Sequence, residues 1–303
     1  VVHDFEINWI DPLKVFPAEN PPSIGDDEPY FWIQWGMDAI NAPEAWNAGY
    51  TGKGVKVFIL DSGIDSEHPD LIQNLNINLC KSFVEGEAFD DNSGEESYHG
   101  THVAGIIAAA DNKYGVIGVA PEAEIVAVKV ISGKTGSGSF SQINKGIIYA
   151  SNNGADVINM SLGAELFRNG LYYDINGVLR KVPAIYIQSL ILAQQRAVNY
   201  AFIKGAVIVT SAGNGGSNYD GNAFIFKIPA ELQNVISVSA TAPDYRYLSL
   251  INGVTPNLDI PSSYIDYGKS LVDLAAPGGD FDFYNLTNWY YDMVLSTFPD
   301  KDF

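Results

Sequence analysis

Two histidines and two glycines open an otherwise apolar stretch, His99-Gly100-Thr101-His102-Val103-Ala104-Gly105. Apolar residues then recur at the spacing of a buried helix, at Val103, Ile106, Ile107 and Ala110. An imidazole is the usual general base near neutral pH, and a glycine beside it lets a substrate or a second backbone approach closely. On this stretch alone, a helix-capping histidine, or less often a metal-binding pair, also explains these residues.

Further side chains with chemical potential follow apolar runs of the chain. Asp61 directly follows the run 55–60, Ser161-Leu162-Gly163 follows 157–160, and Asn214 lies just beyond 206–209. An aspartate can orient and stabilise an imidazolium, and an asparagine amide can donate to a developing oxyanion. Taken singly, Asp61 is explained by a turn or a cap and Asn214 by a left-handed turn between glycines. Their joint occurrence after successive strands favours one catalytic edge.

Parallel strands covered on both faces are predicted to position these residues. The apolar runs rich in Val and Ile, without polar alternation, are 55–60, 125–130, 157–160, 206–209 and 235–238. Between them lie helical patterns ending near Gly154 and Gly205, and a short helix over 41–46 with Asn41 at its cap. Alternation of strand and helix predicts an α/β fold, a doubly wound, mainly parallel sheet with helices on both faces. In such sheets ligands bind at the carboxyl ends of the strands.

Composition narrows the class of protein. The 303 residues carry 17 Lys plus Arg against 36 Asp plus Glu, a formal net charge of −19, which disfavours nucleic acid as a partner. One interpretation of this acidity is a solubilising surface, and the other is that some of the carboxylates bind calcium. The single cysteine excludes an internal disulfide framework. No apolar run approaches the ~20 residues of a membrane helix.

The first thirty residues differ from the remainder. They are rich in Pro, acidic residues and aromatics without periodicity, and the acidic run Asp26-Asp27-Glu28-Pro29 is typical of a linker. We therefore expect an N-terminal arm or the remnant of a pro-segment over 1–30, and a catalytic domain over 31–303. The stretches 164–187, 216–227 and 243–266 are expected to be surface excursions.

Four blocks of the sequence are informative together: Val57-Phe58-Ile59-Leu60-Asp61-Ser62-Gly63-Ile64-Asp65, the histidine stretch 99–105, Ile158-Asn159-Met160-Ser161-Leu162-Gly163, and Ser211-Ala212-Gly213-Asn214. In this order they closely resemble the subtilisin-like serine proteases, the subtilases. The resemblance covers about residues 32–300 and implies the three-layer subtilisin fold. It implies that Asp61 orients His99, that His99 is the general base, and that Asn214 supplies the oxyanion donor. His102 is then a structural residue.

The resemblance also implies a cleft that pairs with extended polypeptide by strand addition. One side of this cleft would be Gly136, Ser137 and Gly138, and the other Ser161, Leu162 and Gly163. Phe140 and Ile143 would line an apolar subsite, although core packing explains Ile143 equally well. A phosphate loop is the competing interpretation of the Gly133-Lys134-Thr135 stretch, but Val128 stands where that motif needs a glycine.

A structural calcium ion is the cofactor that the resemblance implies. The ligands carried over are the side chains of Asp70 and Asn112 and the backbone carbonyls of Ala110, Tyr114 and Val116. Carboxylate, amide and carbonyl oxygens are what this hard cation prefers. The further ligand expected from the N-terminal arm is not identified, and an ordinary loop is the alternative.

The serine nucleophile of the family is expected on a Gly-Thr-Ser turn that opens a buried helix, and no serine in the sequence has that context. Ser161 belongs to the cleft wall, and Ser296 is expected at the end of a strand. We therefore expect a fragment of a secreted serine endopeptidase, whose partners are polypeptide substrates and its own pro-segment. The alternative is a catalytically inactive relative that binds peptide or serves as a scaffold.

Overall fold

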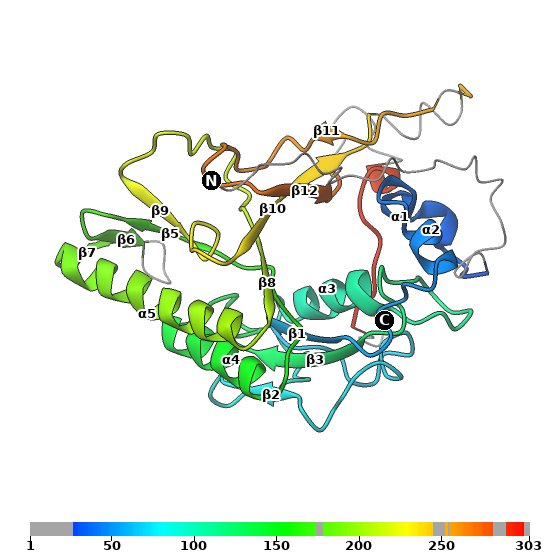
Figure 1. Cartoon of the computed structure of the whole chain (residues 1–303), viewed down its shortest axis with the longest axis horizontal. Coiled ribbons are helices and arrows are strands. Elements are labelled where there is room, and N and C mark those ends of the chain that lie inside the picture. The colour runs from blue at the N-terminus through cyan, green and yellow to red at the C-terminus, as the bar shows by residue number, and fades with distance from the viewer. Residues whose placement is uncertain (1–26, 174–177, 245–251, 254, 281–288, 300–303) are drawn as a thin grey trace, which may run out of the picture.

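The computed structural model describes residues 27–173, 178–244, 252–253, 255–280 and 289–299. At its centre is an eight-stranded sheet with the strand order β11-β10-β8-β4-β1-β3-β2, in which β12 pairs with β10 (Figure 1). Its strand pairs are parallel except for that of β10 with the edge strand β11. The predicted mainly parallel sheet is therefore confirmed.

The strands of this sheet are β1 (Lys56–Asp61), β2 (Lys81–Ser82), β3 (Glu124–Lys129), β4 (Val157–Met160), β8 (Val207–Ser211), β10 (Ile236–Ala242), β11 (Ile260–Pro261) and β12 (Leu274–Pro277). The helices are η1 (Phe31–Ile33), α1 (Trp35–Ala39), α2 (Ala42–Asn47), α3 (Tyr98–Ala108), α4 (Phe140–Asn152), α5 (Ala184–Ile203) and η2 (Trp289–Tyr291).

Alternate side chains of each central strand enter different cores, which is why the strands read as continuous apolar runs. In β1, Phe58 and Leu60 belong to the core beneath α4 and α5. Val57 and Ile59 belong to the core beneath α3 on the opposite face. The sheet thus lies between two layers of helices, as Figure 1 shows.

The predicted apolar runs match the central strands within a few residues. Asn41 does stand at the cap of α2, but it is left-handed, with φ of 55°, and its side chain makes no capping hydrogen bond. The stretches expected to be plain surface excursions contain two small antiparallel sheets. One pairs β5 (Ala164–Phe167) with β9 (Ile225–Ile228), and the other pairs β6 (Leu171–Tyr173) with β7 (Leu179–Lys181).

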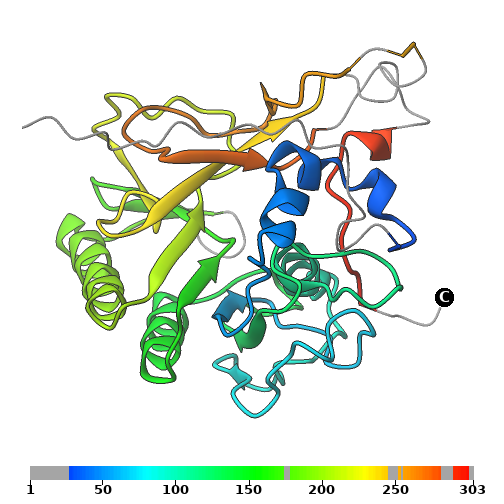
Figure 2. The ribbon, with the colours of Figure 1, turned by 45° about the vertical axis from the view of Figure 1, so that its right-hand side comes forward.

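The segment after η2 contacts α3. The segment 292–299 runs past α3 (Figure 2), where Ser296 Oγ donates to the His102 carbonyl at 2.7 Å and Thr297 Oγ1 to the Thr101 carbonyl at 2.7 Å. Most of the predicted arm, residues 1–26, lies outside the described residues, so its boundary stays a prediction. No helix in the described part of the chain is long and apolar enough to cross a bilayer.

Neighbouring isoleucines on α4 provide a matched test of the two-layered core. Ile147 is fully buried against the sheet, whereas the Ile148 side chain is 42% exposed. We expect Ile147→Ala to lower the free energy of unfolding by about 2–5 kcal/mol, because it leaves a cavity. Ile148→Ala should cost less than about 1 kcal/mol. Urea denaturation of both variants checks this, and equal losses would contradict the packing described.

Candidate active site

Asp61 ends β1 at the carboxyl edge of the sheet, and its carboxylate is buried. The residue is 1% exposed. Its Oδ1 atom accepts a hydrogen bond from the Ser62 backbone N–H at 2.6 Å and lies 2.8 Å from His99 Nδ1. Its Oδ2 atom is also buried and has no hydrogen-bond partner among the described residues. The buried carboxylate therefore contacts the imidazole and the Ser62 N–H rather than bulk water.

His99 lies in the first turn of α3, and a close approach of this turn to the end of β1 makes the contact possible. The Gly100 N–H donates to Ser62 Oγ at 3.0 Å. A Cβ atom at Gly100 would overlap the Gly63 carbonyl oxygen and lie 3.2 Å from Asp61 Cβ. Glycine at position 100 is thus required for the helix to present His99 to Asp61. The His99 side chain remains 44% exposed, so the ring is open to a reactant.

The two histidines of α3 have opposite protonation tendencies. The hydrogen bond with Asp61 raises the pKa of His99, against the effect of burial, which lowers it. Burial lowers the pKa of His102, and the charge of His99 acts in the same direction. An imidazole whose protonated form is stabilised by a buried aspartate is suited to accept a proton during a reaction. His102 lacks such a partner and is a poor candidate for that role.

A buried ion pair supports the loop after Asp61. Lys129, at the end of β3, is fully buried; its Nζ atom donates to the Ser62 carbonyl and lies 3.1 Å from Glu87 Oε2. Glu87 in turn accepts hydrogen bonds from Ser132 Oγ at 2.5 Å and from the Gly133 N–H at 2.9 Å. Burial acts to raise the pKa of Glu87, but these hydrogen bonds and Lys129 lower it overall. The pair thus ties the Asp61 loop to the segment that leads into residues 136–138.

A cleft of about 350 Å³ lies between the two segments expected to bind substrate. Gly136, Ser137 and Gly138 line one side, and Leu162 and Gly163 line the other, with Phe140 and Ile143 also in its wall. Ser161 does not line it. The backbone of Leu162 is held by Thr210 Oγ1, which donates to its carbonyl oxygen at 3.3 Å. The cleft is mixed in character: glycines line its edges, and the polar side chains of Glu165 and Gln194 line it together with apolar ones.

Asn214 follows β8 at the same edge of the sheet as Asp61. Its side chain is exposed, on the turn that begins with Gly213 at φ of 116°. The serines weighed in the sequence lie elsewhere: Ser161 Oγ accepts from Asn159 Nδ2 at 3.1 Å, and Ser296 Oγ bonds the His102 carbonyl. Ser296 lies in an irregular segment rather than at the end of a strand, because its neighbours bond to α3 and pair with no sheet.

The family model of the subtilases, peptidase family S8, matches residues 52–300. The chain belongs to the subtilase family. It is 39% identical over 239 residues to Subtilisin Savinase of Lederbergia lenta, covering 77% of this chain and 74% of that protein. It has the same identity to the alkaline protease of Shouchella clausii, but spans only 53% of that protein's length. The crystal structure of EpiP, an epidermin leader peptide processing serine protease from Staphylococcus aureus, matches with a TM-score of 0.68 and 26% identity, over 90% of this chain and 65% of that one.

The residues expected to bind calcium in this subtilase meet around the loop 110–116. Asp70 is 1% exposed, and its oxygens accept from Asn112 Nδ2 at 3.2 Å and from the Val116 N–H at 3.2 Å. The Asn112 side-chain oxygen accepts from the Tyr114 N–H at 2.9 Å. The amide therefore presents its nitrogen, not its oxygen, to Asp70. Burial raises the pKa of Asp70 to about 6, because the buried carboxylate loses its hydration.

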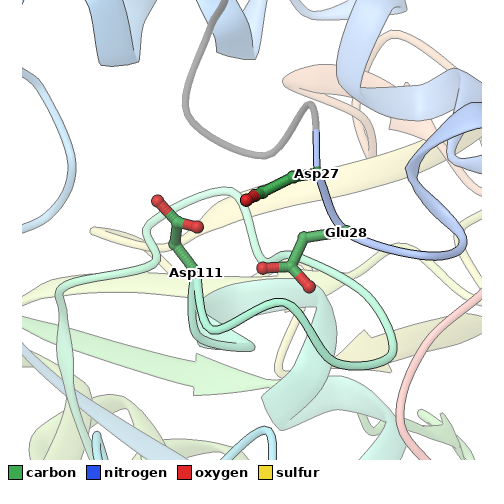
Figure 3. A group of neighbouring side chains, drawn as sticks. All are labelled: Asp27, Glu28 and Asp111. Carbon is green, nitrogen blue, oxygen red and sulfur yellow. The ribbon is translucent and has the colours of Figure 1, made fainter.

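Glu28, from the segment before η1, lies against the same loop. It is 4% exposed, and its Oε1 atom accepts from the Asn112 and Lys113 N–H groups at 2.7 and 2.9 Å. Its Oε2 atom is buried without a hydrogen-bond partner among the described residues. Carboxylate oxygens of Asp27, Glu28 and Asp111 lie within 4.8 Å of one another (Figure 3). The run 26–29 is predicted to be a linker, but within it Glu28 is buried against the loop 110–116. Its acidic charge is the signal in the sequence for such a contact.

The hydrogen bond between Asp61 and His99 predicts how the imidazole titrates. We expect Asp61→Asn to lower the pKa of His99 below its ordinary value, since the stabilising charge is lost while burial remains. Titration of the ring by NMR measures this directly. Asp156→Asn is the matched control, because Asp156 is exposed and accepts the Lys56 N–H at the opposite edge of the sheet. An unchanged His99 pKa in Asp61→Asn would contradict the pairing.

Proposed function

We propose that the protein hydrolyses peptide bonds of extended polypeptides as a serine endopeptidase, and that this chain provides its base, its oxyanion donor and its substrate cleft. The observation that carries the proposal is the 2.8 Å contact between His99 and the buried Asp61 carboxylate. The contact lies at the carboxyl edge of a parallel sheet, where ligands bind in this class of fold. The match to the subtilase family supports it.

In the proposed mechanism His99 accepts the proton of a serine hydroxyl through Nε2 as the serine oxygen bonds to the scissile carbonyl carbon. Asp61 keeps Nδ1 protonated and stabilises the imidazolium that forms. The Asn214 amide donates to the carbonyl oxygen as it becomes an oxyanion. When the intermediate collapses, the C–N bond breaks, His99 returns the proton to the leaving amine and the acyl group stays on the serine. Water then attacks this ester with His99 again as the base, which releases the carboxylic acid and restores the serine. The edges 136–138 and 162–163 hold the substrate backbone meanwhile.

Reaction with a fluorophosphonate probe separates an enzyme from a peptide-binding relative. The full-length protein should be labelled, because only an activated serine attacks the phosphorus centre. His99→Ala should abolish labelling, and His102→Ala should preserve it. Peptide binding without any labelling would overturn the proposal in favour of an inactive peptide-binding protein.

Replacement of Asn214 tests the oxyanion role in the full-length protein. We expect Asn214→Ala to lower kcat by about a hundred- to a thousandfold with little change in KM, a magnitude carried over from a subtilisin. Asn218→Ala is the control, because Asn218 is exposed on the same loop and its side chain accepts only the Asp220 N–H in the described structure. A loss in KM alone would assign Asn214 to ground-state binding instead.

We further propose a calcium ion at the loop 110–116, with Asp70, Asn112 and the carbonyls of Ala110, Tyr114 and Val116 as ligands and Glu28 as the ligand from the arm. The unpartnered buried oxygen of Glu28 and the raised pKa of Asp70 are what a divalent cation would relieve. Asn112 would turn its amide to present the oxygen. The ion would tie the arm to the domain and take no part in the reaction. We also propose that the protein acts outside the cell and that its pro-segment is a partner.

Thermal unfolding with calcium and with chelator tests this site. A ligand that binds only the folded state at a hundred times its Kd adds about 2.7 kcal/mol, so we expect Tm to rise with calcium. Glu28→Gln and Asp70→Ala should each reduce the rise, whereas Glu124→Gln, on a partly exposed side chain of β3, should retain it. Protons compete for Asp70, so the rise should shrink as pH falls below about 6. An equal rise in all variants would contradict the site.

A further inference from the structure

A buried carboxylate on a distant segment holds the turn that carries Asn214. Asp266 is fully buried, and its Oδ1 atom accepts hydrogen bonds from the Gly215 N–H at 3.0 Å and the Ser217 N–H at 3.1 Å. Its own N–H donates to the Gly213 carbonyl at 2.9 Å. The peptide groups immediately before and after Asn214 are therefore both fixed by Asp266.

The glycines beside Asn214 are what allow Asp266 so close. A Cβ atom at Gly213 would overlap Asp266 Oδ2, and one at Gly215 would lie 2.8 Å from Oδ1. Glycines give a turn the greatest conformational freedom, which is unsuited to holding an exposed side chain in one direction. The hydrogen bonds from Asp266 remove that freedom at the position where direction matters.

Lys227 on β9 compensates the charge of Asp266. Its Nζ atom lies 2.5 Å from Asp266 Oδ2 and 3.3 Å from Glu165 Oε1, over the ring of Tyr219. The Tyr219 hydroxyl donates to Glu165 at 2.5 Å, which closes the cluster. A buried ion pair is seldom a better source of stability than apolar packing, because both charges lose their hydration. The ion pair of Lys227 and Asp266 is therefore better explained by a need to fix the geometry of the turn that carries Asn214.

We propose that Asp266, paired with Lys227, is the positioning residue for the oxyanion donor Asn214. The proposal rests on the proposed function, because it assigns Asp266 a purpose only if Asn214 contacts the reacting carbonyl. Asp266 itself acts through the turn and does not touch substrate. Preorganised donors are effective because they need no rearrangement as charge develops, so loosening the turn should weaken the transition state more than the bound substrate.

A double-mutant cycle in the full-length protein tests the link to Asn214. We expect Asp266→Asn to lower kcat by at least about tenfold, within the limit set by loss of the donor itself, and to leave KM within about twofold. In the Asn214→Ala background the same substitution should change kcat by less than about twofold, because the donor it positions is gone. Additive losses in the two backgrounds would overturn the proposal, since a general structural role gives that result.

Control variants and a second measurement keep the outcomes separate. Asp273→Asn should leave kcat unchanged, because the exposed Asp273 accepts the Ser237 N–H rather than a group of the Asn214 turn. Lys227→Arg should retain most of the kcat that Lys227→Met loses, which tests the charge independently should Asp266→Asn not fold.

Amide hydrogen exchange measures how rigidly the turn of Asn214 is held, independently of enzyme activity. Gly215 and Ser217 amides should be protected in the wild-type chain and in Lys227→Arg, and should exchange faster in Lys227→Met, while β1 amides stay unchanged. Rapid exchange in the wild type would overturn the proposal. An inactive wild type with protected amides would instead refute the proposed function, while the contact with Asp266 would stand.

Discussion

The hydrogen bond between a buried carboxylate, Asp61, and a half-exposed imidazole, His99, is the constraint on which the surrounding structure depends. A buried charge is costly unless its environment is arranged around it. The structure meets that cost by bringing α3 against the end of β1, which only Gly100 permits, and by fixing the loop after Asp61 through Lys129. The cleft edge at 136–138 is then tied to the same loop through Glu87. The positions of His99 and of residues 136–138 are therefore fixed through one connected set of contacts.

Charge is distributed unevenly in this molecule. The chain carries a net charge of −19, yet Lys129 and Lys227 are buried, the first beside the loop after Asp61 and the second beside the turn of Asn214. Each is paired with a carboxylate and each supports a loop rather than a helix or a strand. A large net charge favours solubility. The two buried lysines, in contrast, hold loops that apolar packing does not fix. Loops run over the protein surface and bury too little apolar area to be fixed by hydrophobic packing alone.

Much of the fold could be predicted from local pattern, and the parts that could not have a common cause. The central strands are buried on both faces, so their sequences alone reveal them, and their ends reveal Asp61 and Asn214. The sheets β5–β9 and β6–β7 were missed because their strands have only three or four residues and are partly exposed, so they show no clear apolar run. Glu28, Lys129 and Asp266 were missed because whether a charge is buried depends on partners far along the chain. Lys227 and Asp266, for example, are 39 residues apart.

The parallel topology has a consequence for how the chain folds. Parallel neighbours need crossover connections, so β1 pairs with β3 and β4 only after α3 and α4 have closed their loops. Contacts between residues distant in sequence slow folding, since loop entropy is lost before the contact is gained. Asp61, His99, Asn214 and Asp266 come together only when several such closures are complete. The arrangement of these residues therefore depends on pairing across the sheet between distant segments, and we expect it to form late in folding.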